Sequence, residues 1–286
     1  MILKPKAAAQ DCTEASLPAT RRAVFGDVLK LQFFKLALCG LITLAAALPI
    51  FLVTMVEEIY RLSLTQQVQQ GELAQELAAL YSPLSRSMSA VLQIPLLLLL
   101  AVALAGIGRI VKLLAWEEPV LFWSDLRRGL QQNLRQMLVL AALTGIIRFA
   151  CAYAAGQGFW LPGLLALLFL APPAAYMAAG ICVYDISLSQ QFRYALILYA
   201  RCPLATLAAC AVCAVPFLFQ YLPNLYARMI AGLLDGFLIP VVMLGWFCFC
   251  FAQMDRFINP SRYPDLVGRG LAVRHAEDQP SAIGEK

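Results

Sequence analysis

The sequence predicts an all-α integral membrane protein, a helical bundle of about six transmembrane helices with amphipathic interfacial helices. Hydrophobic residues make up 61% of the chain and charged residues 14%, whereas about a quarter of a soluble domain is charged. Several apolar runs reach the roughly 20 residues that a helix needs to cross a bilayer. The clearest is Val91–Val111, which has no charge before Arg109. A β-barrel would instead need alternating segments of about ten residues, and these runs are continuous.

Six apolar segments are long enough to be predicted as spans. They are Leu36–Met55, Val91–Val111, Gln136–Ala155, Phe159–Val183, Pro203–Leu222 and Met229–Phe251. The third is interrupted by Arg148. Only Gly156-Gln157-Gly158 joins it to the fourth, which predicts a tight hairpin.

Basic residues predict the orientation, because cytoplasmic loops retain Lys and Arg. With the N-terminus inside, all but four of the 22 basic residues fall in inner segments; the exceptions are Arg61, Arg86, Arg148 and Arg228. We therefore expect a multi-pass plasma-membrane protein with both termini cytoplasmic. Residues 1–30 form a cytoplasmic segment, 31–256 the membrane domain and 257–286 a cytoplasmic tail. The polar first 35 residues are too long for the n-region of a cleaved signal peptide, so the first span is expected to be a retained anchor.

The outer loop, residues 57–89, is expected to form a short pair of helices resting on the membrane surface. Gly71 separates the two and Pro83 ends the second. Leu73, Leu77 and Leu80 repeat with the period of one helix face. The loop is too short to be an independent catalytic domain.

The inner loops, residues 112–135 and 184–202, are each predicted to contain a basic amphipathic helix in the headgroup plane. In Val120–Arg135 the apolar face is formed by Phe122, Leu126, Leu130 and Leu134. The second helix is Ser187–Arg201. These helices either anchor the protein in the lipid bilayer or dock a partner. The basic residues assigned to lipid or partner docking are Arg127, Arg128, Arg135 and Arg193.

The residue types that support catalysis are scarce, so no catalytic, metal or cofactor site is predicted. The single histidine, His275, lies in the polar tail, which excludes metal sites built from several imidazoles and the usual general base. Cys210 and Cys213 have redox spacing, but a thiolate within a span is costly, so both are interpreted as small apolar residues. No phosphate-binding loop is present, and no nucleic-acid partner is expected.

Two ionisable residues lie inside predicted spans, Arg148 in the third and Asp235 in the sixth. Such residues are costly and usually face the bundle interior. At 1.5 Å per residue both lie about 10 Å from the outer surface. They are therefore predicted to pair and hold the two spans together, or to line a cavity open to the outside. The alternative is that each extends separately to the interface.

Prolines punctuate the spans, and Pro172-Pro173 near the middle of the fourth span is the predicted helix break. A proline within a membrane frees a backbone carbonyl, which can kink the helix or create a polar site. Broken helices occur in transporters, but a kink also serves ordinary packing.

Three short motifs resemble the YesL-like family of bacterial polytopic membrane proteins. They are Leu48-Pro49-Ile50, Gly106-Ile-Gly-Arg109 and Asp125-Leu-Arg-Arg-Gly129-Leu-Gln-Gln-Asn133. The resemblance covers Phe25–Phe251. It implies a helical bundle without settled biochemistry that acts beside carbohydrate import or polysaccharide utilisation.

Together these observations predict a non-enzymatic membrane protein, an accessory component of a carbohydrate or other solute import system. Its partners would be transporter subunits or further copies of itself. The alternative is an autonomous transporter or channel whose pathway passes Arg148, Asp235 and the Pro172-Pro173 break. An intramembrane enzyme ranks third.

Overall fold

The computed structural model describes residues 17–71, 74–222 and 224–272, and every regular element in these ranges is a helix. The all-α prediction is therefore confirmed. In chain order the elements are α1 (Arg21–Leu31), α2 (Phe33–Gln69), α3 (Gln75–Ala115), α4 (Phe122–Gly156), α5 (Leu161–Leu165), the π-helical η2 (Ala166–Leu170), α6 (Ala171–Val183), α7 (Leu188–Arg201), α8 (Pro203–Ala214), the 3-10 helix η3 (Val215–Tyr221), α9 (Leu225–Phe257), α10 (Asn259–Arg262) and the 3-10 helix η4 (Pro264–Leu266).

Six helical segments are long and apolar enough to cross a membrane, as predicted. Four are single helices, namely α2, α3, α4 and α9. The other two are composite: the fourth runs through α5, η2 and α6, and the fifth through α8 and η3. Large apolar side chains such as Leu204 and Val212 are exposed on the outside of the bundle, where lipid would cover them. The protein is a multi-pass membrane protein.

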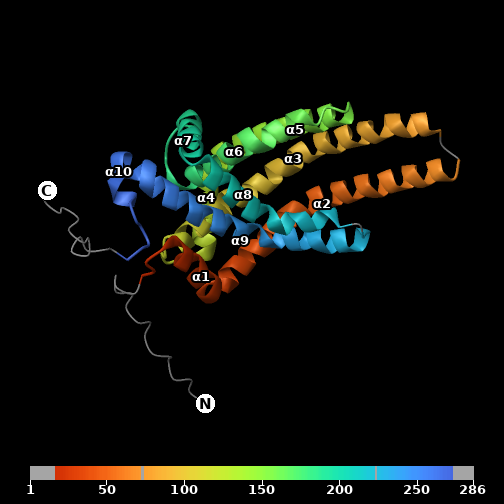
Figure 1. Cartoon of the computed structure of the whole chain (residues 1–286). Helices are drawn as coiled ribbons and strands as arrows, with labels where there is room; N and C mark the ends of the chain where they lie inside the picture. Colours follow the sequence, from red (N-terminus) through yellow and green to blue (C-terminus); the bar gives the residue numbers. More distant parts are fainter. Residues whose placement is uncertain (1–16, 72–73, 223, 273–286) are drawn as a thin grey trace, which may run out of the picture.

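The bundle has two distinct ends (Figure 1). One end carries α1 and α10, and we call it the terminal end. At the other, α2 and α3 project together as a long helical hairpin, and we call it the hairpin end. The positive-inside prediction would place the terminal end in the cytoplasm.

The hairpin differs from the surface helices expected for residues 57–89. No helix breaker follows Met55, so α2 continues unbroken to Gln69. Gly71 has a φ of +73°, a left-handed conformation that glycine adopts without strain, and the chain reverses there. Pro83, expected to end a helix, lies inside α3, because one lost backbone hydrogen bond does not end so long a helix. Leu73 of the predicted apolar stripe lies outside the described residues.

The two inner amphipathic segments also differ from each other. Residues 120–135 do not form a separate helix in the headgroup plane, because α4 runs continuously from Phe122 through the third span. Its buried positions there are Asp125, Gly129 and Asn133, with the leucines only partly buried beside them. By contrast, α7 is a separate helix, capped by Ser187 Oγ and lying at a steep angle to α6 (Figure 1).

The core lies toward the terminal end. Its fully buried apolar side chains include Val24 and Val28 of α1, Ile107 and Ile110 of α3, Tyr176 of α6, Leu198 of α7 and Phe247 of α9. Glycines allow α3 and α4 to approach closely there. A Cβ atom added at Gly129 would lie 2.8 Å from the carbonyl oxygen of Gly106, which is too close for any larger residue without a shift of the backbone.

Two prolines, Pro172 in the fourth span and Pro240 inside α9, each free a backbone carbonyl that accepts a hydrogen bond from a hydroxyl of another helix. Pro172 cannot donate to the carbonyl of Leu168, which instead accepts a hydrogen bond of 2.8 Å from Tyr199 Oη of α7. Pro240 likewise frees the carbonyl of Gly236, which accepts one of 2.8 Å from Thr43 Oγ1 of α2. Proline is tolerated in spans where neighbouring groups satisfy the freed carbonyl.

Candidate functional site

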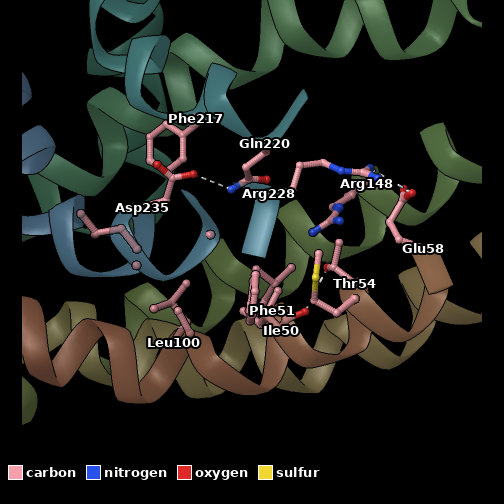
Figure 2. Close-up of a pocket in the computed structure, with 16 residues that line it drawn as sticks. Ile50, Phe51, Thr54, Glu58, Leu100, Arg148, Phe217, Gln220, Arg228 and Asp235 are labelled. Atoms are coloured by element: carbon pink, nitrogen blue, oxygen red, sulfur yellow. Dashed lines mark hydrogen bonds and ion pairs between the residues drawn. The ribbon is translucent and has the colours of Figure 1, made fainter. Parts of the chain in front are cut away.

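A cavity of about 510 Å³ lies between α2, α3, α4, η3 and α9 (Figure 2). We call this part of the bundle the hairpin half. Most of its wall is apolar. Four ionisable side chains also line it: Glu58 of α2, Arg148 of α4, and Arg228 and Asp235 of α9. Such a mixture of apolar wall and few polar groups is typical of a small-molecule site.

Asp235 is held in the cavity wall by the close packing of α9 against α2. A Cβ atom at Gly232 would overlap the ring of Phe51, and one at Gly236 would lie 3.1 Å from Leu44 Cδ1. The bond from Thr43 Oγ1 to the Gly236 carbonyl fixes the adjacent turn. Asp235 is consequently buried, with 4% of its surface exposed.

The carboxylate of Asp235 is only partly satisfied by the protein. Its Oδ2 accepts a hydrogen bond of 2.7 Å from Gln220 Nε2 of η3. Within residues 17–71, 74–222 and 224–272, Oδ1 accepts no hydrogen bond and no basic side chain lies within ion-pair distance. One oxygen therefore remains available to a ligand.

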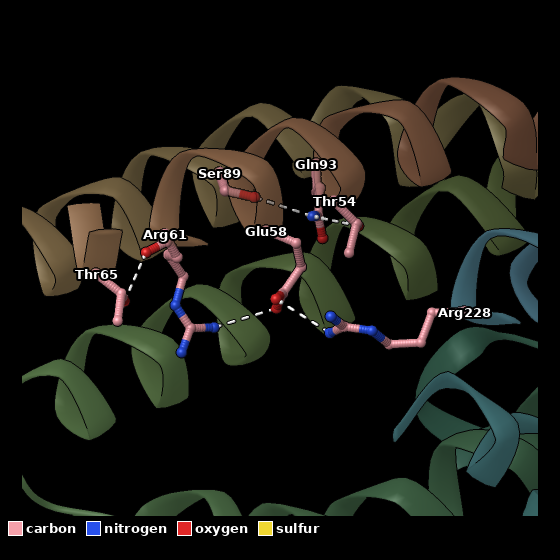
Figure 3. A network of polar contacts seen from close by, with 7 residues as sticks. All are labelled: Thr54, Glu58, Arg61, Thr65, Ser89, Gln93 and Arg228. Atoms are coloured by element: carbon pink, nitrogen blue, oxygen red, sulfur yellow. Dashed lines mark hydrogen bonds and ion pairs between the residues drawn. The ribbon is translucent and has the colours of Figure 1, made fainter. Parts of the chain in front are cut away.

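Glu58 joins two arginines in a polar network at the edge of the cavity (Figure 3). Its Oε1 accepts from Arg61 Nη1 and its Oε2 from Arg228 Nη1, each at 3.1 Å. Beside it, Gln93 Nε2 donates to Thr54 Oγ1 at 3.2 Å. Both oxygens of Glu58 are thus occupied by protein donors.

Arg148 points into the same cavity without a protein partner (Figure 2). Throughout the described part of the chain it makes no hydrogen bond or ion pair; Glu57 of α2 acts on it only through space. The structure therefore brings Arg148 and Asp235 into one cavity but forms no ion pair between them, since Asp235 accepts from Gln220 instead.

The other residues singled out from the sequence lie elsewhere. Arg127 and Arg128 are exposed beside Trp123 at the terminal end of α4. Arg135 of α4 and Arg193 of α7 are exposed as well. Pro172 and Pro173 are buried in the first turn of α6, directly after the π-helical turn, and do not line the cavity.

Sequence reasoning missed Glu58, Gln220 and Arg228. Glu58 falls in the predicted outer loop, Gln220 near the end of the predicted fifth span, and Arg228 in the outer segment just before the predicted sixth span. A signal was present, because Arg228 precedes Asp235 by seven residues, which is two helical turns. That spacing places both on one face of α9 once the helix is known to begin at Leu225.

A second polar cluster, also missed, closes the terminal end. The Arg21 guanidinium donates to the carbonyls of Ala115 (3.2 Å) and Arg269 (2.8 Å) and pairs with Asp255 at 2.9 Å. Asn259 Nδ2 donates to Asp255 Oδ1 at 2.7 Å, and Tyr184 Oη donates to Asn259 Oδ1 at 2.5 Å. We call these residues (Arg21, Tyr184, Asp255, Asn259) the terminal cluster.

Burial raises the pKa of Tyr184 well above its ordinary value, with the charge of Asp255 as the next cause. The hydroxyl therefore stays protonated and acts as a donor. In the same region, burial followed by the charge of Asp27 raises the pKa of Glu117. Glu117 Oε1 is buried without a hydrogen-bond partner in the described structure.

The cavity can bind a solute through charge and apolar contact. It presents two carboxylates, two guanidiniums, one amide and one hydroxyl, with no thiol or imidazole among its lining residues. No protein-family model, curated protein or solved structure matches the chain.

Proposed function

We propose that the protein is a membrane transporter that binds a small solute in the cavity of the hairpin half. The observation that carries this proposal is the cavity of about 510 Å³ lined by Glu58, Arg148, Arg228 and Asp235. Its volume falls in the range of roughly 300–1,000 Å³ typical of small-molecule sites.

The charges in the cavity support a role in binding. A charged side chain within the bilayer costs several kcal/mol and usually marks a pathway or binding site. Arg148 and Asp235 lie inside membrane-crossing helices, and neither is neutralised by an ion pair within the described residues. A purely structural role would favour direct pairing between them, because pairing reduces the cost of burial.

The contrast between the two ends supports transport. In alternating access, a central site communicates with one side of the membrane while the other side is closed. The terminal cluster joins α1, α9 and the segment around Arg269, and so closes the end opposite the cavity. The π-helical turn before Pro172 and the proline inside α9, Pro240, provide places where helices can bend.

A second candidate function is docking to a transporter, and one observation favours it. Trp123, with 68% of its surface exposed, stands beside Arg127 and Arg128 at the terminal end of α4. Aromatic and arginine side chains are enriched in protein interfaces. Replacing both arginines by Glu would abolish co-purification of a stoichiometric partner under this hypothesis, whereas Arg201→Glu on α7 would not.

The first test of the transporter proposal is access to the cavity. Thr54→Cys lines the cavity, whereas Thr43→Cys lies on the same helix at a fully buried position that does not line it. A membrane-impermeant maleimide added to intact cells should label Thr54→Cys well above wild type and leave Thr43→Cys unlabelled. Labelling of Thr54→Cys no higher than that of wild type would mean that the cavity is not accessible, and would overturn the proposal.

The second test is uptake by purified protein in proteoliposomes. Radiolabelled sugars, carboxylates, amines and amino acids should be compared with protein-free liposomes. Accumulation of at least one class, lost in the Asp235→Asn variant, is the expected result. No accumulation of any class would overturn the transport role and favour docking.

A further inference from the structure

We infer that the solute is an apolar α-amino acid, whose carboxylate binds Arg148 and whose ammonium group binds Asp235. This inference rests on the proposed function and specifies the chemistry of the same cavity. It follows from which charges in the cavity the protein already satisfies and which it leaves available.

The first step is to separate the occupied charges from the available ones. Glu58 accepts one hydrogen bond on each carboxylate oxygen, from Arg61 and Arg228 at 3.1 Å each. Both oxygens of Glu58 are therefore used, while Arg228 keeps one ion pair with Glu58 and a buried Nε without a hydrogen-bond partner in the described structure. Arg148 and Asp235 are the two charges of the cavity that form no ion pair within the described residues, and they have opposite signs.

The second step is the geometry of each remaining group. The guanidinium of Arg148 has no protein acceptor in the described structure, and its planar set of donors matches a carboxylate bidentately. Asp235 accepts from Gln220 through Oδ2 at 2.7 Å. Its Oδ1 is left for a donor such as an ammonium group.

The third step is complementarity. A simple anion would neutralise Arg148 and leave Asp235, of whose surface 4% is exposed, as an uncompensated buried carboxylate. A simple cation would neutralise Asp235 and leave the exposed guanidinium of Arg148 without a counter-ion inside a membrane-crossing helix. An unpaired charge in such surroundings is costly. A zwitterion neutralises both groups at once.

The fourth step is the wall of the cavity, which specifies the rest of the solute. Its apolar members come from four elements: Ile50, Phe51, Leu97, Leu100, Phe217 and Ile239. A branched or aromatic side chain would gain free energy by leaving water for such a wall. A small polar amino acid would not gain this contribution.

The test compares three compounds that share one carbon skeleton. L-leucine carries both charges, isoamylamine lacks the carboxylate, and 4-methylpentanoate lacks the ammonium group. Isothermal titration of the full-length protein in lipid nanodiscs should show leucine binding at least about tenfold tighter than either of the other compounds, since a charge-assisted hydrogen-bonded pair contributes more than 1.4 kcal/mol.

Two variants assign each charge to its partner. Arg148→Gln should weaken leucine about tenfold or more and leave isoamylamine unchanged. Asp235→Asn keeps an acceptor for Gln220; it should weaken leucine similarly and leave 4-methylpentanoate unchanged. Arg127→Gln, at the exposed terminal end of α4, should change none of the affinities. Thermal melting and gel filtration identify any variant that fails to fold.

The outcomes separate this inference from the proposed function. If 4-methylpentanoate or isoamylamine bound as tightly as leucine, the site would recognise a single charge and the zwitterion inference would be wrong, while transport would stand. The inference would equally be wrong if none of the three compounds bound. The proposed function is then decided independently by cavity labelling and by uptake of the other solute classes.

Discussion

The two ends of the bundle treat the same kind of side chain in opposite ways. At the terminal end, the Arg21 guanidinium donates to two backbone carbonyls and pairs with Asp255, with 8% of its surface exposed. In the hairpin half, Arg148 has no such partner in the part of the chain that the structure describes.

This difference distinguishes a charge that holds the fold together from one that is available for binding. A buried ion pair is strongly destabilised when one partner is removed, because the other is left uncompensated. A charged side chain that makes no hydrogen bond or ion pair with the protein can be replaced at little structural cost. Stability and binding measurements should therefore separate the two ends.

The largest effect is expected at the terminal cluster. Asp255→Ala leaves Arg21 buried without its carboxylate and should lower the free energy of unfolding by about 3–5 kcal/mol. The measurement is thermal unfolding of the purified protein in detergent. Arg22→Ala changes an exposed arginine that lies on α1 next to Arg21, and it should be nearly neutral. Equal effects of the two substitutions would contradict the structural role of the cluster.

Close packing at the terminal end predicts the next effect. Gly129→Ala would bring a Cβ atom to 2.7 Å from Arg109 Cβ and 2.8 Å from the Gly106 carbonyl oxygen. Overpacking of this kind costs about 1–3 kcal/mol. Gly163→Ala serves as the matched control because no atom lies within 4 Å of its added methyl group. The melting temperature should fall only for Gly129→Ala.

Removal of the hydroxyl that compensates Pro240 should have an effect of similar size. Thr43→Val keeps the shape of the side chain but removes the 2.8 Å hydrogen bond to the Gly236 carbonyl. Loss of a buried hydrogen bond of this type costs about 1–3 kcal/mol. Thr65→Val, whose hydroxyl contacts only the Arg61 carbonyl of its own helix, should leave the melting temperature unchanged. A drop as large as that of Thr43→Val in this control would argue against the compensation of Pro240.

Arg148→Gln should have little effect on unfolding, within about 0.5 kcal/mol as for exposed positions without contacts. Its effect should appear instead in solute binding. The comparison between the two ends would fail if Arg148→Gln destabilised the protein as much as Asp255→Ala.

The smallest expected effect concerns pH. The pKa of Glu117 is raised by burial and by Asp27, so folding favours its protonated form. This contribution to stability is fully present below the ordinary glutamate pKa of about 4.5 and is lost as the pH rises through the raised value. Glu117→Gln should therefore stabilise the protein at neutral pH and make no difference below about pH 4. Melting curves across this range would test the sign.

Sequence reasoning worked best where hydropathy alone decides the outcome. The six spans follow from uninterrupted apolar runs, and Arg148 and Asp235 were visible because a charge within such a run is conspicuous. Glu58 and Arg228 could not be assigned, since their roles depend on α2 and α9 extending beyond the apolar runs. The terminal cluster was hidden for a different reason: Arg21 and Arg269 are 248 positions apart, and each is an ordinary interfacial residue.

Amphipathic periodicity failed for the first part of α4. Leucines were expected to face the core, but Asp125 and Asn133 are the buried residues. Arg109 Nε donates to Asp125 at 3.3 Å, and Asn133 Nδ2 donates to the Ala105 carbonyl at 3.1 Å. Polar side chains can be buried when they are hydrogen-bonded, and those partners on α3 are not apparent from the pattern of α4 alone.

The hydroxyl groups that compensate the two prolines set conditions on how the chain is synthesised. The carbonyl of Leu168 lacks its hydrogen-bond donor until the ribosome adds Tyr199, 31 residues later. For the sixth span the order is reversed, since Thr43 precedes its acceptor Gly236 by 193 residues. The fourth span is therefore synthesised before the residue that donates to its free carbonyl, whereas the last span is synthesised after its donor.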